Sequence, residues 1–264
     1  MRFIRLTMEY DGKNFCGWQR QKNAVSVQQT LEEALFRITQ ELTKTRASGR
    51  TDAKVHAQGQ VVSFSTNTKL SCEVLMRALN GVLPKDVAIK ELVEVGPDFD
   101  ARFSATKKTY RYQIYTGIRS PLREEKFWQL PYQLNIEAMK HASQYLLGEH
   151  DFKSFQAADC DRVNTVRHLT DIEITQTDFL HGAQVVIKVS GNAFLKNMVR
   201  ILVGTLVQVG RGVYAPEYVQ AILEKKDRTF AGRTAPPHGL FLESVEYARN
   251  SSGMLQRPLK SIAQ

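Results

Sequence analysis

The sequence predicts an α+β protein built from two similar units, each a mainly antiparallel sheet backed by helices. With 264 residues, the chain is long enough for two halves that each bury a core of their own. In both halves, segments whose apolar residues alternate with polar ones are interleaved with segments whose apolar residues recur at helical spacing. No repeat is visible residue by residue. We expect domains at 1–104 and 105–248, followed by a loosely ordered tail at 249–264.

The first half opens on a strand. Ile4, Leu6 and Met8 share one face of residues 2–9, and Asp11-Gly12 is typical of the turn that follows. Ser26 with Gln29 three residues later resembles a capping box, so we expect a helix from residue 27 to about 38. The remaining predicted elements are a strand at 60–66, a short helix at 72–79 closed by Asn80-Gly81, and a strand at 87–95.

The second half repeats this rhythm. Its predicted strands are 108–116, 169–175, 185–189 and 240–247. Its predicted helices are 135–147 with Gly148 as C-cap, a long one over 192–209, and a short one opened by Pro216 and ending at 223. In the long helix Lys196 and Arg200, four residues apart, are expected on one face.

Composition limits the partners. The 36 Lys and Arg against 27 Asp and Glu give a net charge of +9, which favours a polyanion such as nucleic acid. No apolar run is long enough for a membrane span and the first residues lack a secretory signal, so we expect a cytoplasmic protein without a membrane partner. Three cysteines with no CxxC pair and no suitably spaced histidine argue against a zinc site.

The segment 49–57, Gly-Arg-Thr-Asp-Ala-Lys-Val-His-Ala, holds the strongest candidate for chemistry. Asp52 is its only acid, and a lone carboxylate fits covalent or proton-abstraction chemistry, whereas paired-acid hydrolysis needs a second carboxylate. Arg50 is two residues away and, in an extended segment, leaves on the same face, so an ion pair is easy to form. Taken alone, Arg-Thr-Asp is also typical of a surface turn.

Two further residues have both a functional and a structural interpretation. Tyr110 lies on a predicted strand rich in cations and aromatics, where it would either stack on a base or pack within the sheet. Arg200 interrupts the apolar helix, so it either meets an anionic partner or faces solvent.

The loop 10–21, dense in aromatic, cationic and amide groups, would either contact RNA or simply pack under Trp18. We assign no chemistry to His56, because it has no evident partner in the sequence.

Together these segments resemble the bacterial tRNA pseudouridine synthase A family, in which an aspartate in a GRTDAGVHA-like motif is catalytic. The resemblance covers nearly the whole chain, and several spaced motifs occur in the family's order. They are Tyr10-Asp11-Gly12, Gly17-Trp18-Gln19-Arg20-Gln21, residues 49–57, Asp100-Ala101-Arg102-Phe103-Ser104-Ala105, Tyr110-Arg111-Tyr112 and Met198-Val199-Arg200.

The resemblance implies isomerisation of uridine to pseudouridine at positions 38, 39 and 40 in the anticodon arm of tRNA, without cofactor or metal. It implies Asp52 as the catalytic residue, Tyr110 as a contact to the uracil ring, and Arg50 and Arg200 as residues that orient Asp52 or contact the flipped nucleotide. It also implies two α+β domains whose sheets join across a central RNA-binding cleft, and a homodimer. The route at Asp52, a covalent adduct or a glycal, stays open.

One position departs from the family pattern. Lys54 stands where the family usually has glycine. If the backbone there has positive φ, a lysine is strained by about 1 kcal/mol or more. We expect the alternative, an ordinary backbone with Lys54 contacting a phosphate.

The competing function is an RNA-binding module without chemistry. Asp52 discriminates this module from a synthase, because only the synthase needs its carboxylate.

Overall fold

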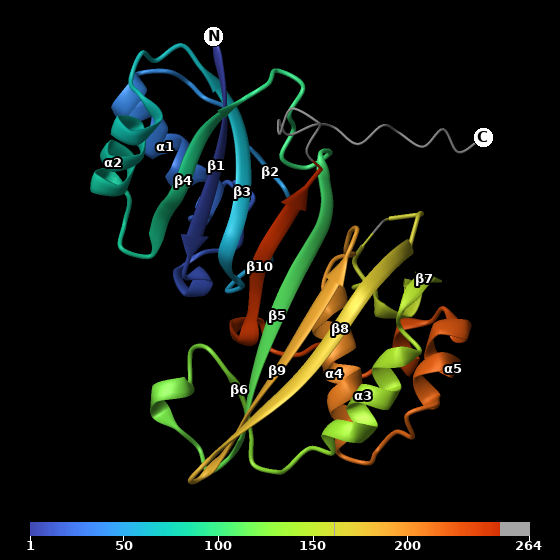
Figure 1. Ribbon diagram of the computed structural model, residues 1–264. Coiled ribbons are helices and arrows are strands. Elements are labelled where there is room, and N and C mark those ends of the chain that lie inside the picture. Colours follow the sequence, from blue (N-terminus) through green and yellow to red (C-terminus); the bar gives the residue numbers. More distant parts are fainter. Residues whose placement is uncertain (161, 249–264) are drawn as a thin grey trace, which may run out of the picture. The chain divides into compact units, whose positions relative to one another are not determined.

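The computed structural model describes residues 1–160 and 162–248, and the chain within it forms two compact units. The first unit comprises Met1–Lys108 together with the strand residues from Leu242 onward, and the second is Thr109–Phe241. Each combines a sheet with helices (Figure 1), which confirms the predicted mixed α+β composition. The two units differ from the predicted division in that the last strand belongs with the first unit, and the predicted tail lies outside the described residues.

The sheet of the first unit is centred on β1, Arg2–Tyr10. Its hydrogen-bonded order is β4-β1-β3-β10, and β1 is antiparallel to both neighbours. Ile4, Leu6 and Met8 are fully buried, as their alternation predicts. The other strands of this sheet are β4 (Val87–Val95), β3 (His56–Thr66) and β10 (Leu240–Tyr247), and β2 (Arg46–Ala47) pairs with β3.

Two helices, α1 (Val27–Thr39) and α2 (Cys72–Val82), lie side by side along this sheet (Figure 1). The Ser26 side chain accepts the Gln29 amide, so the predicted cap of α1 is confirmed. The predicted end of α2 at Asn80-Gly81 is wrong, because the helix continues to Val82. Asn80 does not end the helix; instead its side-chain amide exchanges two hydrogen bonds with the backbone of Ile89 in β4.

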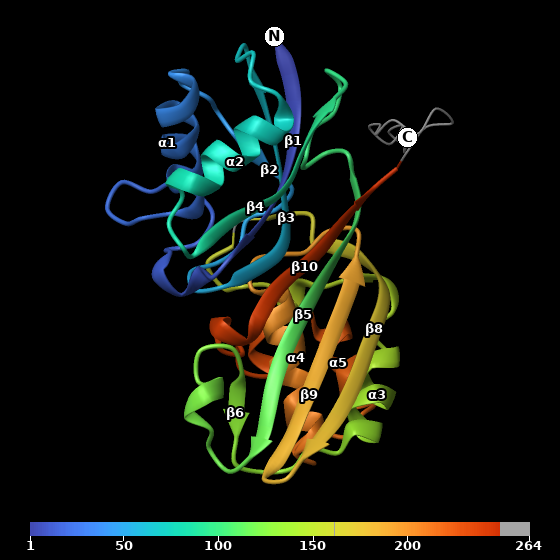
Figure 2. The same ribbon diagram turned by 60° about the vertical axis from the view of Figure 1, so that its left-hand side comes forward.

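The second unit has the strand order β5-β9-β8-β7, with β6 parallel to β5. Its helices gather on one face of this sheet (Figure 2). None of the helices in the described residues is long and apolar enough to cross a membrane. The strands are β5 (Ala105–Gly117), β6 (Trp128–Leu130), β7 (Gly148–Asp151), β8 (Val166–Phe179) and β9 (Gly182–Gly191), and the helices are α3 (Ile136–Gln144), α4 (Met198–Gly210) and α5 (Tyr218–Lys225).

The long helix is shorter than predicted. It begins at Met198, not at residue 192, because Asn197 adopts a left-handed conformation with φ of 60°. The helical spacing of apolar residues before it comes from a loop that packs inward, in which Leu195 is buried. Lys196 therefore does not share a helix face with Arg200, and it pairs with Asp159 at 2.6 Å instead.

Two other predicted helix ends differ. The α3 helix ends at Gln144, and Gly148, with φ of 92°, begins β7 instead of capping the helix. Pro216 lies before the N-cap of α5, Glu217, and its carbonyl accepts the amide of Val219. Short 3-10 turns complete the described chain at Gly12–Asn14, Pro121–Arg123, Lys153–Phe155, Arg228–Phe230 and Pro237–Gly239.

Candidate active site

The segment that contains Asp52 is the connection from β2 to β3 in the first unit. Asp52 is half-buried, its carbonyl accepts the amide of Val55 at 3.2 Å, and the chain reverses between these two residues. Arg50 is exposed on the same loop. The segment is therefore a turn, but one in which Asp52 is half-buried instead of fully on the surface.

A buried hydrogen-bond network holds the Asp52 loop against strands β1 and β3. The hydroxyl oxygens of Tyr10 and Thr51 lie 2.8 Å apart, and the Gln60 side chain donates to the carbonyl of Gly49 at 2.9 Å. The Ser48 hydroxyl donates to the Gln60 amide oxygen at 2.8 Å. Burial raises the pKa of Tyr10 to about 12, although hydrogen bonds with Thr51 and Gln60 lower it in part. The phenol therefore stays protonated near neutral pH and the network keeps its hydrogens.

The loop 10–21 also packs against the Asp52 loop. The amide of Trp18 donates to the carbonyl of Thr51 at 3.0 Å, and the amide of Lys54 donates to the carbonyl of Phe15 at 3.2 Å. Trp18 itself is buried. Of the two interpretations of loop 10–21, these contacts support packing, and they show that the loop positions residues 51–54.

Gly17 explains why this packing is close. Its φ is +106°, and a Cβ there would lie 2.7 Å from the carbonyl oxygen of Thr51. Both the backbone conformation and the approach of the two loops exclude a side chain. At Gly12 a Cβ would lie 2.0 Å from the carbonyl oxygen of Val55, so the two glycines allow the two loops to touch at both ends.

His56, the first residue of β3, is buried under the same contact. Its Nδ1 lies 3.0 Å from the amide nitrogen of Gly12 and 3.0 Å from a carboxylate oxygen of Asp11. One ring nitrogen cannot accept from Gly12 and donate to Asp11 at once, so the two contacts belong to states of the ring without and with a hydrogen on Nδ1. In either state His56 fastens the start of β3 to the loop 10–21, so its contacts here are structural.

Lys54 corrects our prediction. Its φ is 64°, a left-handed conformation, so the expected ordinary backbone is wrong and the strained alternative holds. The physical reason is the tight turn between Asp52 and Val55, combined with the hydrogen bond that the Lys54 amide makes to Phe15. Lys54 is exposed, so the strain of roughly 1 kcal/mol is not offset by burial of its side chain.

Tyr110 belongs to the second unit and lies near the middle of β5. It is 8% exposed and meets the ring of Phe194 edge to face, with centroids 5.0 Å apart. Its neighbour on the same face, Tyr112, is fully buried and donates to the carbonyl of Pro236 at 2.7 Å. Burial raises the pKa of Tyr112. Tyr110 thus packs within the sheet.

Arg200 lies in the first turn of α4, also in the second unit. Its Nε donates to the carbonyl of Ala235 at 2.7 Å and one terminal nitrogen donates to the side chain of Asn197 at 2.8 Å. These bonds hold the half-buried guanidinium in a fixed orientation. The simple alternative, an arginine that extends freely into solvent, does not describe it.

The predicted site residues thus fall into two pairs. Arg50 and Asp52 share one loop of the first unit, and Tyr110 and Arg200 belong to the second. The residues that sequence reasoning missed are the loop's supports, Ser48 and Gln60. Gln60 is a polar residue at the start of a largely apolar strand segment, and this signal is visible in the sequence. Its hydrogen-bond partners are not visible there.

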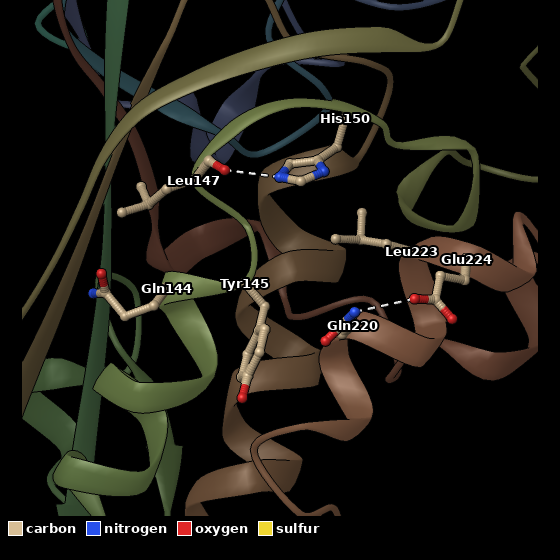
Figure 3. A pocket seen from close by; sticks show the side chains of 7 residues that line it. All are labelled: Gln144, Tyr145, Leu147, His150, Gln220, Leu223 and Glu224. Atoms are coloured by element: carbon tan, nitrogen blue, oxygen red, sulfur yellow. Dashed lines mark hydrogen bonds between the residues drawn. The ribbon is translucent and has the colours of Figure 1, made fainter.

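The second unit also has an open pocket of about 370 Å³ (Figure 3). None of the predicted site residues lines it. The His150 ring contacts the carbonyl of Leu147 at 2.7 Å and Gln220 donates to Glu224 at 3.1 Å, so much of its polar lining is internally bonded. The lining residues are Gln144, Tyr145, Leu147, His150, Gln220, Leu223 and Glu224.

Comparison with known proteins agrees with the motif in the Asp52 loop. The family described as tRNA pseudouridine synthase matches residues 6–104 and 142–248. A protein of Geobacter sulfurreducens named tRNA pseudouridine synthase A is 44% identical over 248 residues, 94% of this chain and 100% of its own length. Proteins of the same name from Pelobacter propionicus and Thermoanaerobacter sp. are 46% and 44% identical, each over 94% of this chain and 100% of its own length. The chain therefore belongs to the tRNA pseudouridine synthase family of isomerases.

Proposed function

We propose that this protein converts uridine to pseudouridine at positions 38, 39 and 40 in the anticodon arm of tRNA, with Asp52 as its single catalytic residue and no cofactor. Membership of the family supports the reaction. The observation that carries the assignment to Asp52 is its place in a half-buried turn that two other segments hold by hydrogen bonds. A carboxylate that served only as a surface cap would not need such support.

The chemistry requires one bond to be exchanged for another. The bond between N1 of uracil and C1′ of ribose breaks, the ring turns, and a bond forms between C5 and C1′. The C5 proton then leaves, and N1 takes up a proton, so the product is an isomer of the substrate. Asp52 either adds to the substrate as a nucleophile or removes a ribose proton to give a glycal. Both routes need an ionised carboxylate with access to the nucleotide, and a half-buried side chain has such access.

The other three residues are assigned supporting roles. Arg50, exposed beside Asp52, would contact the phosphate or the flipped nucleotide. Arg200, whose orientation is set by Ala235 and Asn197, would orient the carboxylate or bind a phosphate. Tyr110 would contact the detached uracil ring. Flipping a base out of a stem costs a few kcal/mol, which backbone contacts of a protein with net charge +9 can offset.

Substitution of Asp52 tests the proposal. With tRNA tritiated at C5 of uridine, we expect wild type to release tritium and Asp52→Asn to bind tRNA but release none. Asp98→Asn is the matched control, since it removes the same charge from an exposed position of the same unit and should release tritium as wild type does. Full activity of Asp52→Asn would refute the assignment. Release by neither protein would point instead to an RNA-binding module without chemistry.

The substrate positions and the oligomeric state need their own measurements. Pseudouridine mapping of tRNA from cells lacking the protein should show loss confined to positions 38 to 40. Losses elsewhere would contradict the proposed specificity. The family resemblance also supports a homodimer, and light scattering that gave a monomer mass at working concentrations would contradict that part of the proposal.

A further inference from the structure

The turn at 99–104 connects β4 to β5 in the first unit. Two of its residues, two positions apart, are buried and hold it in place. Phe99 and Ala101 are buried in a small apolar cluster with Val61. The Tyr247 hydroxyl donates to the carbonyl of Ala101 at 2.8 Å, and the rings of Tyr247 and Phe99 are 5.1 Å apart. The backbone of this turn is therefore fixed on its inner side.

Asp100 fixes the outer side. One of its carboxylate oxygens accepts the amides of Arg102 and Phe103 at 2.9 and 3.0 Å. The other accepts the guanidinium of Arg46 at 2.5 Å. Arg46 lies in β2, which leads directly into the Asp52 loop. The carboxylate thus joins the 99–104 turn to the strand that precedes the catalytic segment.

The two residues that the turn presents outward form an exposed aromatic and cationic group. The Phe103 side chain is 56% exposed although the turn beneath it is well packed. The guanidinium carbons of Arg102 and Arg46 lie 5.3 and 5.9 Å from the centroid of its ring. Within residues 1–160 and 162–248, Arg102 pairs with no carboxylate, so its charge is not neutralised locally.

Protein stability does not account for this arrangement. The hydrogen bond from residue 103 to Asp100 uses the backbone amide and would persist with any residue there except proline. A single exposed phenylalanine is ordinary, but one on a rigid turn with two guanidinium groups around its ring has the composition of a single-stranded nucleic-acid contact. Such contacts stack a base on an aromatic ring and bind the adjoining phosphates with arginine.

We propose that Phe103, with Arg102 and Arg46, is a binding site for an unpaired nucleotide of the RNA substrate, separate from the nucleotide at Asp52. The base stacks on the open part of the Phe103 ring, and the guanidinium groups bind the flanking phosphates. Stacking reads no hydrogen-bond pattern, so the site accepts any base and contributes to affinity more than to sequence choice. This proposal rests on the RNA substrate of the proposed function, but not on the role of Asp52.

Measuring the affinity for tRNA tests the role of the Phe103 ring. We expect Phe103→Ala to weaken tRNA binding by about tenfold or more, Phe103→Leu to weaken it similarly, and Phe103→Trp to retain it. Phe36→Ala is the matched control, since Phe36 is a 42% exposed phenylalanine on α1 of the same unit, and it should bind as wild type does. Binding by Phe103→Ala within twofold of wild type, or by Phe103→Leu as tight as by Phe103→Trp, would overturn the proposal.

Fluorescence gives a second, independent readout. The chain's two tryptophans, Trp18 and Trp128, are 3% and 5% exposed, so the indole that Phe103→Trp introduces should dominate any change caused by a stacked base. We expect a single-stranded oligonucleotide to quench its emission and polyphosphate, which has charge but no bases, to leave it unchanged. Equal response to both would overturn stacking. Because Asp52→Asn retains binding but not catalysis, failure of this site and failure of the catalytic assignment are distinguishable.

The arginines are tested through salt. Arg102→Ala should reduce the slope of log affinity against log salt concentration by about one, whereas Phe103→Ala should leave the slope unchanged. A slope unaffected by Arg102→Ala would remove the phosphate contact from the proposal. Thermal melting of each variant, expected to match wild type because both side chains are exposed, shows that the loss is not one of folding.

Discussion

Tyr10 and Thr51 share a buried hydrogen bond, with 2.8 Å between their hydroxyl oxygens, and Thr51 directly precedes Asp52. Tyr10 is the last residue of β1, so the core strand of the first unit is bonded directly to the loop of the proposed catalytic aspartate. Gln60 donates weakly to the same phenol oxygen at 3.5 Å and bonds to Gly49 at the loop's other end. The position of the loop thus depends on residues that make no contact with substrate in our proposal.

Removing the phenol hydroxyl should therefore affect rate as well as stability. Tyr10→Phe is expected to lower the free energy of unfolding by about 1 kcal/mol, because the Thr51 hydroxyl loses a buried partner. It should lower kcat by about tenfold with little change in KM, since misplacement of the carboxylate affects the chemical step. Ser71→Ala, which loses the N-cap hydrogen bond of α2 in the same unit, is the control for stability alone. Similar kcat values for both variants would contradict a positioning role for Tyr10.

The strained backbone at Lys54 predicts a stabilising substitution. Lys54→Gly should raise the free energy of unfolding by roughly 1 kcal/mol, because glycine adopts a φ of 64° without steric cost. Gln40→Gly, at a φ of 58° after α1, should give a comparable gain and so calibrate the effect. Chemical denaturation measures both.

A phosphate contact of Lys54 is a separate expectation and needs a separate measurement. If the ammonium group binds RNA, Lys54→Gly also lowers the salt dependence of tRNA binding, while Gln40→Gly does not. An unchanged salt slope in Lys54→Gly would sink the phosphate contact.

Gly17 should tolerate no side chain. Gly17→Ala places a Cβ 2.7 Å from the carbonyl oxygen of Thr51 and also strains the backbone at a φ of +106°. Gly212→Ala isolates the second effect, because φ is +75° there and no atom lies within 4 Å of the added Cβ. We expect a loss of about 1 kcal/mol at Gly212 and a larger loss at Gly17, with reduced kcat only at Gly17. Equal losses in the two variants would show that the loops separate without cost.

The Asp100 carboxyl group makes the free energy of unfolding depend on pH. Burial raises the pKa of its carboxyl, but hydrogen bonds from the Phe103 amide and the Arg46 guanidinium outweigh burial and hold the pKa below its usual value. A depressed folded-state pKa means that the ionised group contributes stability above the unfolded-state pKa of about 3.9 and loses it as pH falls through the folded value. The free energy of unfolding of Asp100→Asn should therefore be lower than that of wild type at pH 7, and this difference should shrink below about pH 4. Asp98→Asn, at an exposed position, should follow wild type throughout; a difference for Asp100→Asn that stays constant with pH would contradict the argument.

Elements with a local signal could be predicted from the amino-acid sequence alone. Alternation placed β4 and β10 at their observed bounds, and Ser26 with Gln29 placed the start of α1, because a strand face and a helix cap depend on residues a few positions apart. The motif at 49–57 likewise identified Asp52 as the candidate for chemistry, because its isolation from other acids is visible in the sequence.

The remaining features depend on contacts that the folded chain creates. The left-handed backbone at Lys54 follows from a hydrogen bond to Phe15, and the late start of α4 follows from the left-handed Asn197, which an apolar period cannot reveal. The bonds of Thr51 to Tyr10 and of Asp100 to Arg46 join residues that are 41 and 54 positions apart. Such contacts form only when separate strands are brought together, so local periodicity holds no information about them.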